Sequence, residues 1–342
     1  MSIVVAGFDV HRSQITFDAL DQESGELSRG RIASTPEAVK QWAERFPGRE
    51  IHIAVEACTG WYFVCEALTE AGAMAHLADP AETRARRAKK RRAKTDREDA
   101  RLLRTLLEED RLPEAWIPPP HICELRTLTR LRKTLVDERT AWLERIQATL
   151  FHHGVSGAPA KLRSESGRAF LAALELPAAS HRRIEVSLAM IEALDAQLAP
   201  LVAELRAFAR RQAGCKALMA HYGIAELMAS TILAELGDVA RLSSSRKAVR
   251  FAGLDVGVNR SDRRSRAGKL TRQGSPQLRW ALYEAALHAS KKSSPDRAYY
   301  LSLRERLSHT QATLTIARKL AKRCFHSLRE LGPGALEPIP SE

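Results

Sequence analysis

Short apolar runs typical of strands alternate with helical patterns through the first hundred residues, and this alternation limits the possible folds. Helical patterns lie at 35–46, where Thr35 can cap the helix and Pro36 takes its first position, and at 61–72. Five strand-like runs surround them, at 3–10, 15–20, 26–33, 51–57 and 73–79. The order β-β-β-α-β-α-β, followed by a further helix, predicts an α/β domain with a mixed sheet and helices packed on its faces.

Acidic side chains lie at the ends of two of these strand-like runs. Asp9 is near the end of the first apolar run, and Glu56 ends the run IHIAVE. In a mixed α/β sheet the carboxyl ends of neighbouring strands open into the crevice where ligands bind. Two carboxylates placed there can share one ion.

Further acidic residues lie in the stretch KTDREDARLL. Asp96 and Asp99 are three residues apart, so a helix places them on one face and turns Glu98 away. With Asp9 and Glu56 they offer four carboxylates and no His or Cys, a donor set that suits Mg²⁺ or Mn²⁺. Two such ions can clamp the attacking and leaving oxygens of a phosphodiester.

Helix capping is a competing interpretation of the same stretch. Thr95 followed by Glu98 forms a capping box, and Asp96 suits the positive end of the helix dipole. Capping therefore explains these three residues without any metal. It does not explain Asp99 or the acids at two strand ends, so the four acids taken together favour a metal site.

Positive charge is concentrated in particular parts of the chain, which has a net charge of +13. Residues 1–80 carry 6 basic and 12 acidic side chains, a net of −6, whereas residues 241–330 carry 21 and 6, a net of +15. Such an excess favours a polyanionic partner, DNA or RNA, through long-range attraction and counterion release. The densest basic run gives the candidate nucleic-acid contacts Arg84, Arg86, Arg87, Lys89, Lys90, Arg91, Arg92 and Lys94.

The proline-rich segment WIPPP at 116–120 breaks the pattern and predicts a domain boundary. Two long helical patterns follow, and the second has apolar residues spaced 3-4-3-4-3 like a coiled-coil seam, interrupted by Pro200: Ile191, Leu194, Leu198, Leu201, Leu205 and Phe208. We predict an antiparallel helical hairpin or oligomerisation arm, although an ordinary helix in a globular core would give the same pattern. The predicted divisions are 1–115, an arm over 116–215, a mainly helical domain over 216–332 and a loose tail over 333–342.

The C-terminal half contains two candidate phosphate-binding features. The segment 217–239 predicts helix, turn, helix, with Gly223 in a turn that either presents backbone N–H groups to a phosphate or simply joins two helices. Beyond it, Ser261 lies in a basic loop where guanidinium groups can stabilise an alkoxide and a phosphoryl transition state. No His is adjacent as a base, and a serine here can also simply bind phosphate, as can Ser265 and Ser275. The surrounding basic residues are Arg260, Arg263, Arg264, Arg266, Lys269 and Arg272.

The cysteines and the hydropathy indicate a cytoplasmic protein. The five cysteines are scattered and form no C-x-x-C pair, so we expect free, buried thiols and no zinc site. We find no signal-peptide pattern and no uninterrupted apolar stretch of 18 residues.

Three stretches resemble, in order and at similar separations, the acidic motifs of the insertion sequence one-ten family of transposases. They are GFDVHRSQITFDAL, IAVEACTGWY and KTDREDARLL. The tetrad FAGL (251–254) and the run GSPQLRWAL (274–282) resemble the C-terminal transposase domain of that family. The chain departs from the family pattern in having HYGI at 221–224, where PGIG is common, and Asp255-Val256-Gly257, where a proline usually follows FAGL.

The resemblance implies a RuvC-like, RNase H-like domain whose DEDD metal set is Asp9, Glu56, Asp96 and Asp99. It also implies that Ser261 is the nucleophile of a transposase that forms a phosphoserine intermediate with Mg²⁺ or Mn²⁺. The implied partners are element and target DNA, a structured non-coding guide RNA, and further copies of the chain in a dimer or tetramer with a composite active site. We expect such a protein to be cytoplasmic and associated with the nucleoid.

Three other functions fit the same residues. A site-specific DNA invertase would look nearly the same. A structure-specific nuclease of the resolvase type needs only the acids and would release free ends without a protein adduct. A non-catalytic nucleic-acid-binding protein would use its acids only as capping residues.

Overall fold

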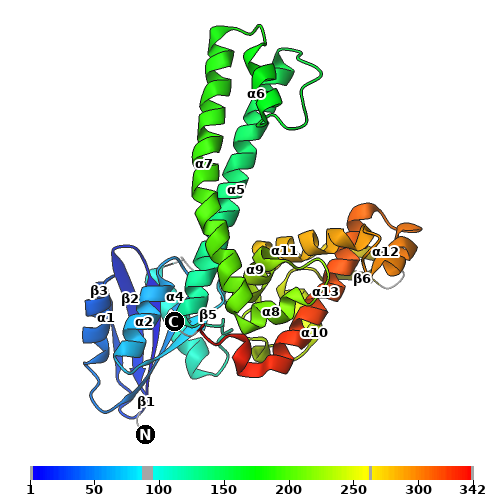
Figure 1. Cartoon of the computed structure of the whole chain (residues 1–342). Helices are drawn as coiled ribbons and strands as arrows, with labels where there is room; N and C mark the ends of the chain where they lie inside the picture. The colour runs from blue at the N-terminus through cyan, green and yellow to red at the C-terminus, as the bar shows by residue number, and fades with distance from the viewer. Residues whose placement is uncertain (1–2, 87–94, 262–263, 340–342) are drawn as a thin grey trace. The chain divides into compact units, whose positions relative to one another are not determined.

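The computed structural model describes residues 3–86, 95–261 and 264–339, and it divides the chain into two compact units, Met1–Ile117 and Pro118–Glu342. The division falls inside WIPPP, two residues beyond the predicted boundary. Pro120 is the first residue of the helix that opens the second unit, a position where the missing N–H costs nothing. Each unit is coloured by residue number in Figure 1.

The first unit has the predicted order β-β-β-α-β-α-β followed by helix, which confirms the mixed α/β interpretation. Its elements are β1 (Ile3–Val10), β2 (Gln14–Asp21), β3 (Leu27–Ala33), α1 (Pro36–Ala43), β4 (Glu50–Glu56), α2 (Trp61–Glu70), β5 (Met74–Ala78), α3 (Pro80–Ala85) and α4 (Asp96–Glu108). Thr35 caps α1 as predicted, because its side chain accepts a hydrogen bond from the backbone N–H of Ala38 at 3.2 Å.

The five strands form one sheet in the order β3-β2-β1-β4-β5. The pairs β1–β2 and β2–β3 are antiparallel, whereas β1–β4 and β4–β5 are parallel. Alternate residues of β1, among them Val4 and Phe8, are buried in a cluster with Trp42 of α1 and Leu68 of α2. The other set of β1 residues therefore faces α4.

Two contacts hold α4 close against the sheet. Gly7 of β1 leaves no room for a side chain, because an added Cβ would lie 2.1 Å from the Ala100 carbonyl oxygen and 2.6 Å from the Arg104 backbone nitrogen. Arg104, itself buried, donates from Nε to Asp18 Oδ1 of β2 at 2.5 Å and from Nη1 to Glu108 Oε2. Both contacts fix the height and rotation of α4 over the strand ends.

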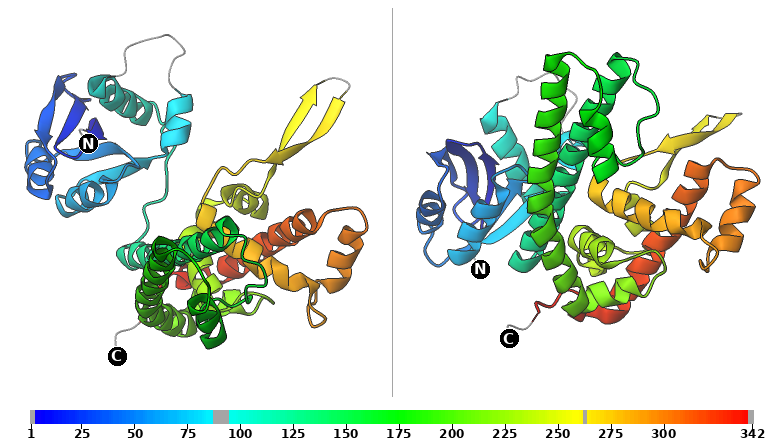
Figure 2. Two further views of the ribbon diagram at one scale, coloured as in Figure 1. Left: turned by 90° about the horizontal axis from the view of Figure 1, so that it is seen from above. Right: turned by 45° about the horizontal axis from the view of Figure 1, so that its top comes forward.

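The second unit is mainly helical, as predicted, with one added β-hairpin (Figures 1 and 2). Its elements are α5 (Pro120–His152), α6 (Glu165–Ala172), α7 (Ala178–Arg211), α8 (Ala213–Met219), α9 (Glu226–Leu236), η1 (Val239–Arg241), α10 (Ser245–Phe251), β6 (Val256–Ser261), β7 (Arg264–Leu270), α11 (Pro276–Leu287), η2 (His288–Ser290), α12 (Arg297–Arg304), α13 (His309–Leu331) and η3 (Gly332–Ala335).

Helices α5 and α7 lie side by side as a long hairpin, and α7 continues through Pro200 (Figure 1). The seam is buried in two separate clusters. Ile191 packs in an outer cluster with Ile146 of α5, whereas Leu201 and Leu205 belong to the large core of the unit. The hairpin is thus an arm at its outer end and a core element at its base.

The same helix, α7, is the one candidate among the described residues that is long and apolar enough to cross a membrane by length and composition. Its best window of 18 residues has a mean hydropathy of 1.5. Asp195 of this helix accepts a hydrogen bond from Arg139 of α5 at 2.8 Å, and Glu192 is paired with Arg168. One helix of this kind is weak evidence for a membrane span, and 28% of that window is buried inside the structure.

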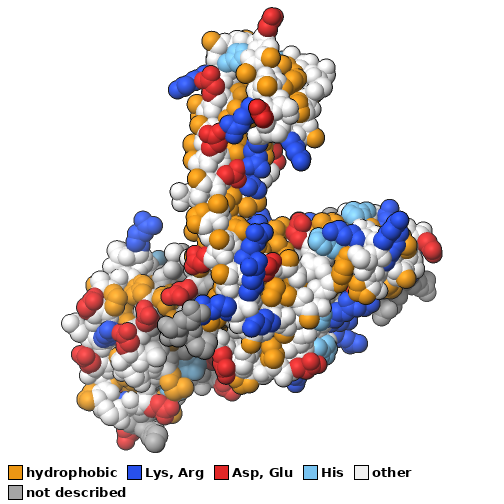
Figure 3. Space-filling model, viewed as in Figure 1, with side chains coloured by type: hydrophobic (Ala, Val, Ile, Leu, Met, Phe, Trp, Pro, Cys, Tyr) orange, Lys and Arg blue, Asp and Glu red, His pale blue; other side chains and the backbone are white. Residues whose placement is uncertain are grey.

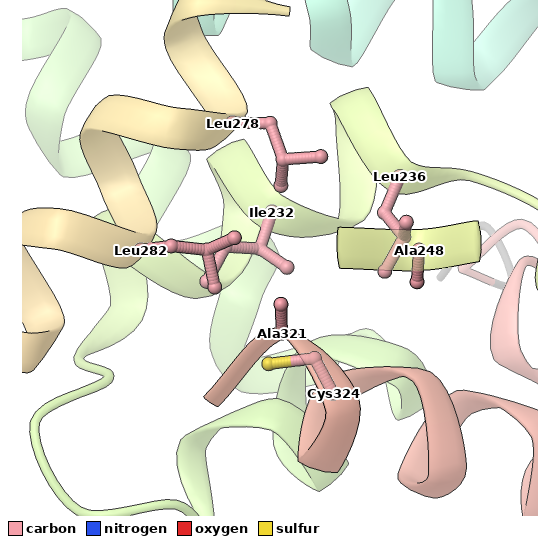
Figure 4. Close-up of a pocket in the computed structure, with 7 residues that line it drawn as sticks. All are labelled: Ile232, Leu236, Ala248, Leu278, Leu282, Ala321 and Cys324. Carbon is pink, nitrogen blue, oxygen red and sulfur yellow. The ribbon is translucent and has the colours of Figure 1, made fainter. Parts of the chain in front are cut away.

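The core of the second unit gathers short and branched side chains from α9, α10, α11 and α13. Seven of them converge at one small apolar gap in the packing (Figure 4), namely Ile232, Leu236, Ala248, Leu278, Leu282, Ala321 and Cys324. Burial raises the pKa of the Cys324 thiol to about 12, and it does the same for Cys65 and Cys215. These free thiols therefore stay protonated, whereas Cys58 and Cys123 are only half-buried.

The end of the chain corrects the expectation of a loose tail, as far as residue 339. Ala335 is buried, and its carbonyl oxygen accepts a hydrogen bond from Gln212 Nε2 at 2.8 Å. His121 Nε2 lies 2.6 Å from the Leu336 carbonyl oxygen. The Gly-Pro-rich composition suggested disorder, but these two side chains from distant helices bind its carbonyls.

Substituting Gly7 tests how closely α4 is docked. Gly7→Ala forces a methyl group against two backbone atoms that cannot rotate away, and we expect it to lower the free energy of unfolding by about 3 kcal/mol. Gly334→Ala is the matched control, since nothing lies within 4 Å of the added carbon. Urea denaturation of both variants measures the difference. Equal stability of Gly7→Ala and the unchanged protein would contradict the close packing.

Candidate functional site

Asp9 and Glu56 lie at the carboxyl ends of adjacent parallel strands and on the same face of the sheet. The register pairs Phe8 with Val55, so Asp9 and Glu56 are the next residues along β1 and β4. Asp9 shares its face with Gly7, which touches α4. The parallel register therefore places both carboxylates under the start of α4.

Glu56 is assigned to this face by its neighbour along β4. Ala54, two residues earlier, packs with Leu103 of α4, and alternate residues of a strand share a face.

Asp96 and Asp99 occupy the first turn of α4, as the spacing predicts. The helix begins because Thr95 adopts an extended conformation and its Oγ1 accepts the Glu98 backbone N–H at 3.3 Å. Ala100 and Leu103 are fully buried, which fixes the rotation of the helix. The capping and metal interpretations are therefore compatible, since the cap determines where the acids stand.

Three side chains gather tightly enough to hold one ion: Asp9, His11 and Asp96 each place a ligand atom within 4.8 Å of the other two. His11 Nε2 lies 3.1 Å from Asp9 Oδ2 and 3.5 Å from Asp96 Oδ1. Asp9 is only 7% exposed, whereas Asp96 is half-buried and His11 is exposed. The cluster is thus anchored in the sheet and open on one side.

The other two predicted acids lie near this cluster and are not part of it. Asp99 is close enough to Asp9 to raise its pKa, together with Asp96. Glu56 does not place an oxygen within the 4.8 Å group found among the described residues. The structure thus brings two of the four acids into direct ligand range and leaves two at the margin.

His11 was missed by the sequence analysis, which considered a set of carboxylates only. It lies just after β1, and its signal is its spacing: two residues after a strand-end acid, on the turn that leads to β2. An imidazole there reaches back over the strand end.

Burial is the main influence on the protonation of Asp9. Burial raises the pKa of this carboxyl above its usual 3.8, His11 opposes the rise, and Asp99 and Asp96 add to it. Because the folded protein holds the proton more tightly than the unfolded chain, stability falls as the pH rises from 3.8 through the folded pKa. At neutral pH the ionised carboxylate remains a cost to folding.

A divalent cation fits these residues. Two carboxylates, with a third and a fourth nearby, match the oxygen donors that hard ions prefer, and a cation offsets the cost of ionised Asp9. Thr16 stands opposite Asp9 in the β1–β2 register, and its buried Oγ1 has no hydrogen-bond partner among the described residues. A hydrated ion near the strand ends could supply one.

Ser261 is the last residue of strand β6, which corrects the predicted loop. The backbone of β6 pairs with β7, with Ser261 opposite Arg264, and the hairpin extends from the helical body of its unit (Figure 2). The alternating valines Val256 and Val258 favour a strand, but the many charged and small residues that follow hide this signal in the sequence.

Two glycines clamp the base of this hairpin and explain the FAGL and GSP motifs. Gly274, with φ of 125°, approaches Phe251 so closely that a Cβ would lie 2.0 Å from its carbonyl oxygen. Gly253, with φ of 63°, likewise lies too close to the Gln273 carbonyl oxygen to carry a side chain without a shift. Thr271 Oγ1 also hydrogen-bonds Asp255, which joins the two ends of the hairpin.

The remaining predicted contacts are distributed as follows. Gly223, with φ of 91°, lies in the turn between α8 and α9, where it packs on the Ala285 carbonyl of α11. Arg272 is exposed and has a positive φ of 52°.

Arg84 and Arg86 are exposed at the end of α3. Arg260, Arg264, Arg266 and Lys269 lie on the β6–β7 backbone. Arg87, Lys89, Lys90, Arg91, Arg92, Lys94 and Arg263 fall outside the described residues.

An α/β unit with an acidic cluster at its strand ends and a basic helical unit together define a candidate nucleic-acid-processing enzyme. A family model of the IS110-type DEDD domain, described as "Transposase", matches residues 6–153, which contain all four acids. A second model, described as "Transposase IS116/IS110/IS902 family", matches residues 215–301, which contain Ser261. Together the two models match most of the chain, which is therefore similar to this family of transposases over both of its units.

Two individual proteins named as transposases are also similar to this chain. A probable family 20 transposase of Pseudomonas aeruginosa is 25% identical over 299 residues, which cover 84% of this chain and 84% of its own length. The transposase for insertion sequence element IS1111A of Coxiella burnetii is 24% identical over 205 residues, 58% of this chain and 56% of its own. A DEDD transposase domain indicates the use of a divalent metal.

Replacing Asp9 by its neutral isostere should have opposite effects with and without metal. Asp9→Asn removes a buried charge, so the metal-free variant should melt at a higher temperature than the unchanged protein at neutral pH. Added Mn²⁺ should raise the melting temperature of the unchanged protein by mass action and leave the variant unaffected. Glu98→Gln serves as the control, because Glu98 is exposed on the first turn of α4, which also carries Asp96. This variant should respond to Mn²⁺ like the unchanged protein. An equal response of Asp9→Asn would place the ion elsewhere.

Proposed function

We propose that the protein is the transposase of an insertion sequence that cuts and rejoins DNA through a covalent phosphoserine intermediate, with a divalent-metal centre in a RuvC-like domain. The observation that carries the proposal is the meeting of Asp9, His11 and Asp96 where the ends of β1 and α4 converge. The strand order β3-β2-β1-β4-β5 supports an RNase H-like fold for this domain.

In this proposal the acidic residues hold and orient the metal. Asp9 and Asp96 would bind it directly, with Glu56 and Asp99 as the further members of the DEDD set. Mg²⁺ or Mn²⁺ would supply electrostatic stabilisation of the charge on the phosphate oxygens. The burial of Asp9 supports this role, because a carboxylate held in a fixed, poorly hydrated position binds a cation in a defined geometry.

Ser261 is the proposed nucleophile. Its Oγ attacks the phosphorus, an Oγ–P bond forms, and the bond from phosphorus to the sugar oxygen breaks. The hydroxyl proton must pass to a general base outside the hairpin, and the leaving oxygen takes up a proton from the solvent. Ser261 pairs with Arg264 at the end of β6, and Gly253 and Gly274 hold the base of this hairpin.

Two polyanions are proposed as partners: the DNA of the element and target, and a structured non-coding RNA that guides it. The net charge of +15 over residues 241–330 supports at least one of them in the second unit. Lys and Arg side chains form a row at the foot of the α5–α7 hairpin in the view of Figure 3. The outer arm is the proposed contact between protomers of a dimer or tetramer, which would complete a composite active site.

Trapping the covalent intermediate tests the proposed chemistry. The protein, its element DNA and its candidate guide RNA are incubated with Mg²⁺ and resolved on a denaturing gel. Ser261→Ala should abolish the protein–DNA adduct, because the nucleophile is missing, while Ser265→Ala should retain it. Asp96→Ala should lower adduct formation by about a hundredfold or more, the scale of lost electrostatic stabilisation.

The same gel distinguishes the competing functions. Cleaved DNA with free ends and no adduct, dependent on Asp96 and independent of Ser261, would indicate a resolvase-type nuclease. Uncleaved DNA on this gel, together with binding on a native gel that is unchanged in Asp9→Ala and Glu56→Ala, would indicate a non-catalytic nucleic-acid-binding protein.

His11 should set the metal preference of the centre. Imidazole is a softer donor than a carboxylate, so His11 should favour Mn²⁺ over Mg²⁺, which prefers oxygen. We expect His11→Ala to lower the ratio of Mn²⁺ to Mg²⁺ affinity by about tenfold, or ~1.4 kcal/mol. Calorimetric titration with each ion measures the ratio, and Arg12→Ala, exposed on the same turn, is the control. An unchanged ratio would mean that His11 is not a ligand.

A further inference from the structure

A groove lies beside the candidate metal centre, between β3 and α4, on the face of the sheet that carries Asp9. Its volume is about 750 Å³. Four arginines line it, Arg29 and Arg31 from β3 and Arg97 and Arg101 from α4. Asp96 lines the groove and also belongs to the Asp9–His11–Asp96 cluster, so the groove opens directly onto the metal ligands.

The backbone aligns the four guanidinium groups in two pairs. Arg29 and Arg31 are alternate residues of β3, opposite Asp18 and Thr16 of β2, so both extend from the face that α4 covers. Arg97 and Arg101 are one helical turn apart on α4. The backbone advances by ~7 Å from Arg29 to Arg31 and by ~6 Å from Arg97 to Arg101. Both distances are close to the spacing of neighbouring phosphates in an extended nucleic-acid strand.

The four arginines share the groove with three acids, Asp18, Asp96 and Glu98, but most of the arginines are not paired with them. All four arginines are exposed, and within the described parts of the chain Arg31, Arg97 and Arg101 make no ion pair. Arg29 is the exception, since its Nε donates to Asp18 Oδ2 at 2.6 Å. Asp18 also accepts a hydrogen bond from the buried Arg104 of α4. Its charge is therefore shared with Arg104, and it neutralises little of the charge in the groove.

Isolated exposed arginines are common and are usually only hydrated. What distinguishes these is their convergence in one groove, where Arg29 and Arg31 are two of the only 6 basic side chains in residues 1–80. Guanidinium groups bind phosphate oxygens with two parallel hydrogen bonds, so unpaired arginines in a groove select a phosphodiester backbone.

We infer that this groove binds the backbone of the DNA strand whose phosphate is presented to the metal centre. The inference rests on the proposed function for its choice of DNA, because the strand that passes Asp96 is the one that reacts. Arg31, Arg97 and Arg101 hold successive phosphates, and Arg29, fixed by Asp18, forms one wall.

The test measures binding of fluorescein-labelled oligothymidine to the full-length protein in EDTA over a series of KCl concentrations. Each lost phosphate contact lowers the slope of log K against log [KCl] by about 0.7 for a single strand, so Arg31→Gln combined with Arg101→Gln should lower it by about 1.4. Arg45→Gln is the matched control, an exposed arginine that lies beside Phe17 on the opposite face of the sheet. It should change the oligothymidine slope less than the double variant does.

Three outcomes would overturn the inference. The first is an unchanged oligothymidine slope in the double variant, and the second is an equal loss in Arg45→Gln. The third is a loss seen with oligouridine alone, which would assign the groove to RNA. Because no metal is present, this result is independent of the Mn²⁺ response of Asp9→Asn, so the groove and the metal centre can fail separately.

Discussion

The candidate site depends on the way one helix is pinned to the sheet. Asp96 and Asp99 belong to α4, whereas Asp9 and Glu56 belong to strands, so the site exists only where α4 lies close to the strand ends. Gly7 permits that approach, and the buried ion pair from Arg104 to Asp18 locks it. A buried ion pair adds little net stability, because desolvation offsets the attraction, but it is directional. Its value here is that it fixes which face of α4 meets β1.

Asp9 lowers the stability of the fold at neutral pH, and it is also a member of the candidate metal site. Burial raises the pKa of this carboxyl, and the neighbouring acids add to the cost of ionising it. A sequence selected for stability alone would place a neutral residue there, since ionising a buried carboxyl remains costly even with His11 beside it. In the proposed function the retained carboxylate is a ligand whose counter-charge comes from outside the chain.

Sequence patterns predicted the order of strands and helices along the first unit and the acids of α4 because both follow from local signals. The strands of the first unit are short apolar runs, and the three-residue step from Asp96 to Asp99 fixes a helical face. His11 was overlooked because a histidine in a turn has no periodic signal. The strand ending at Ser261 was predicted as a loop because its charged and small residues obscure the alternation. The groove arginines could not be predicted, since only tertiary packing brings β3 to α4, more than sixty residues later.

The two candidate centres are built on different physical principles. The acidic cluster relies on a rigid sheet and a docked helix, because metal ligands must converge within a few ångströms. Ser261 instead lies on a two-stranded hairpin that extends from its unit, with Gly253, Gly274 and the Thr271–Asp255 hydrogen bond at its base. An isolated hairpin is marginally stable in water, so a nucleophile placed there becomes well positioned only when a partner packs against the hairpin. A serine presented in this way would be reactive in an assembled complex with nucleic acid and inactive in the free protein, which limits cleavage of the wrong DNA.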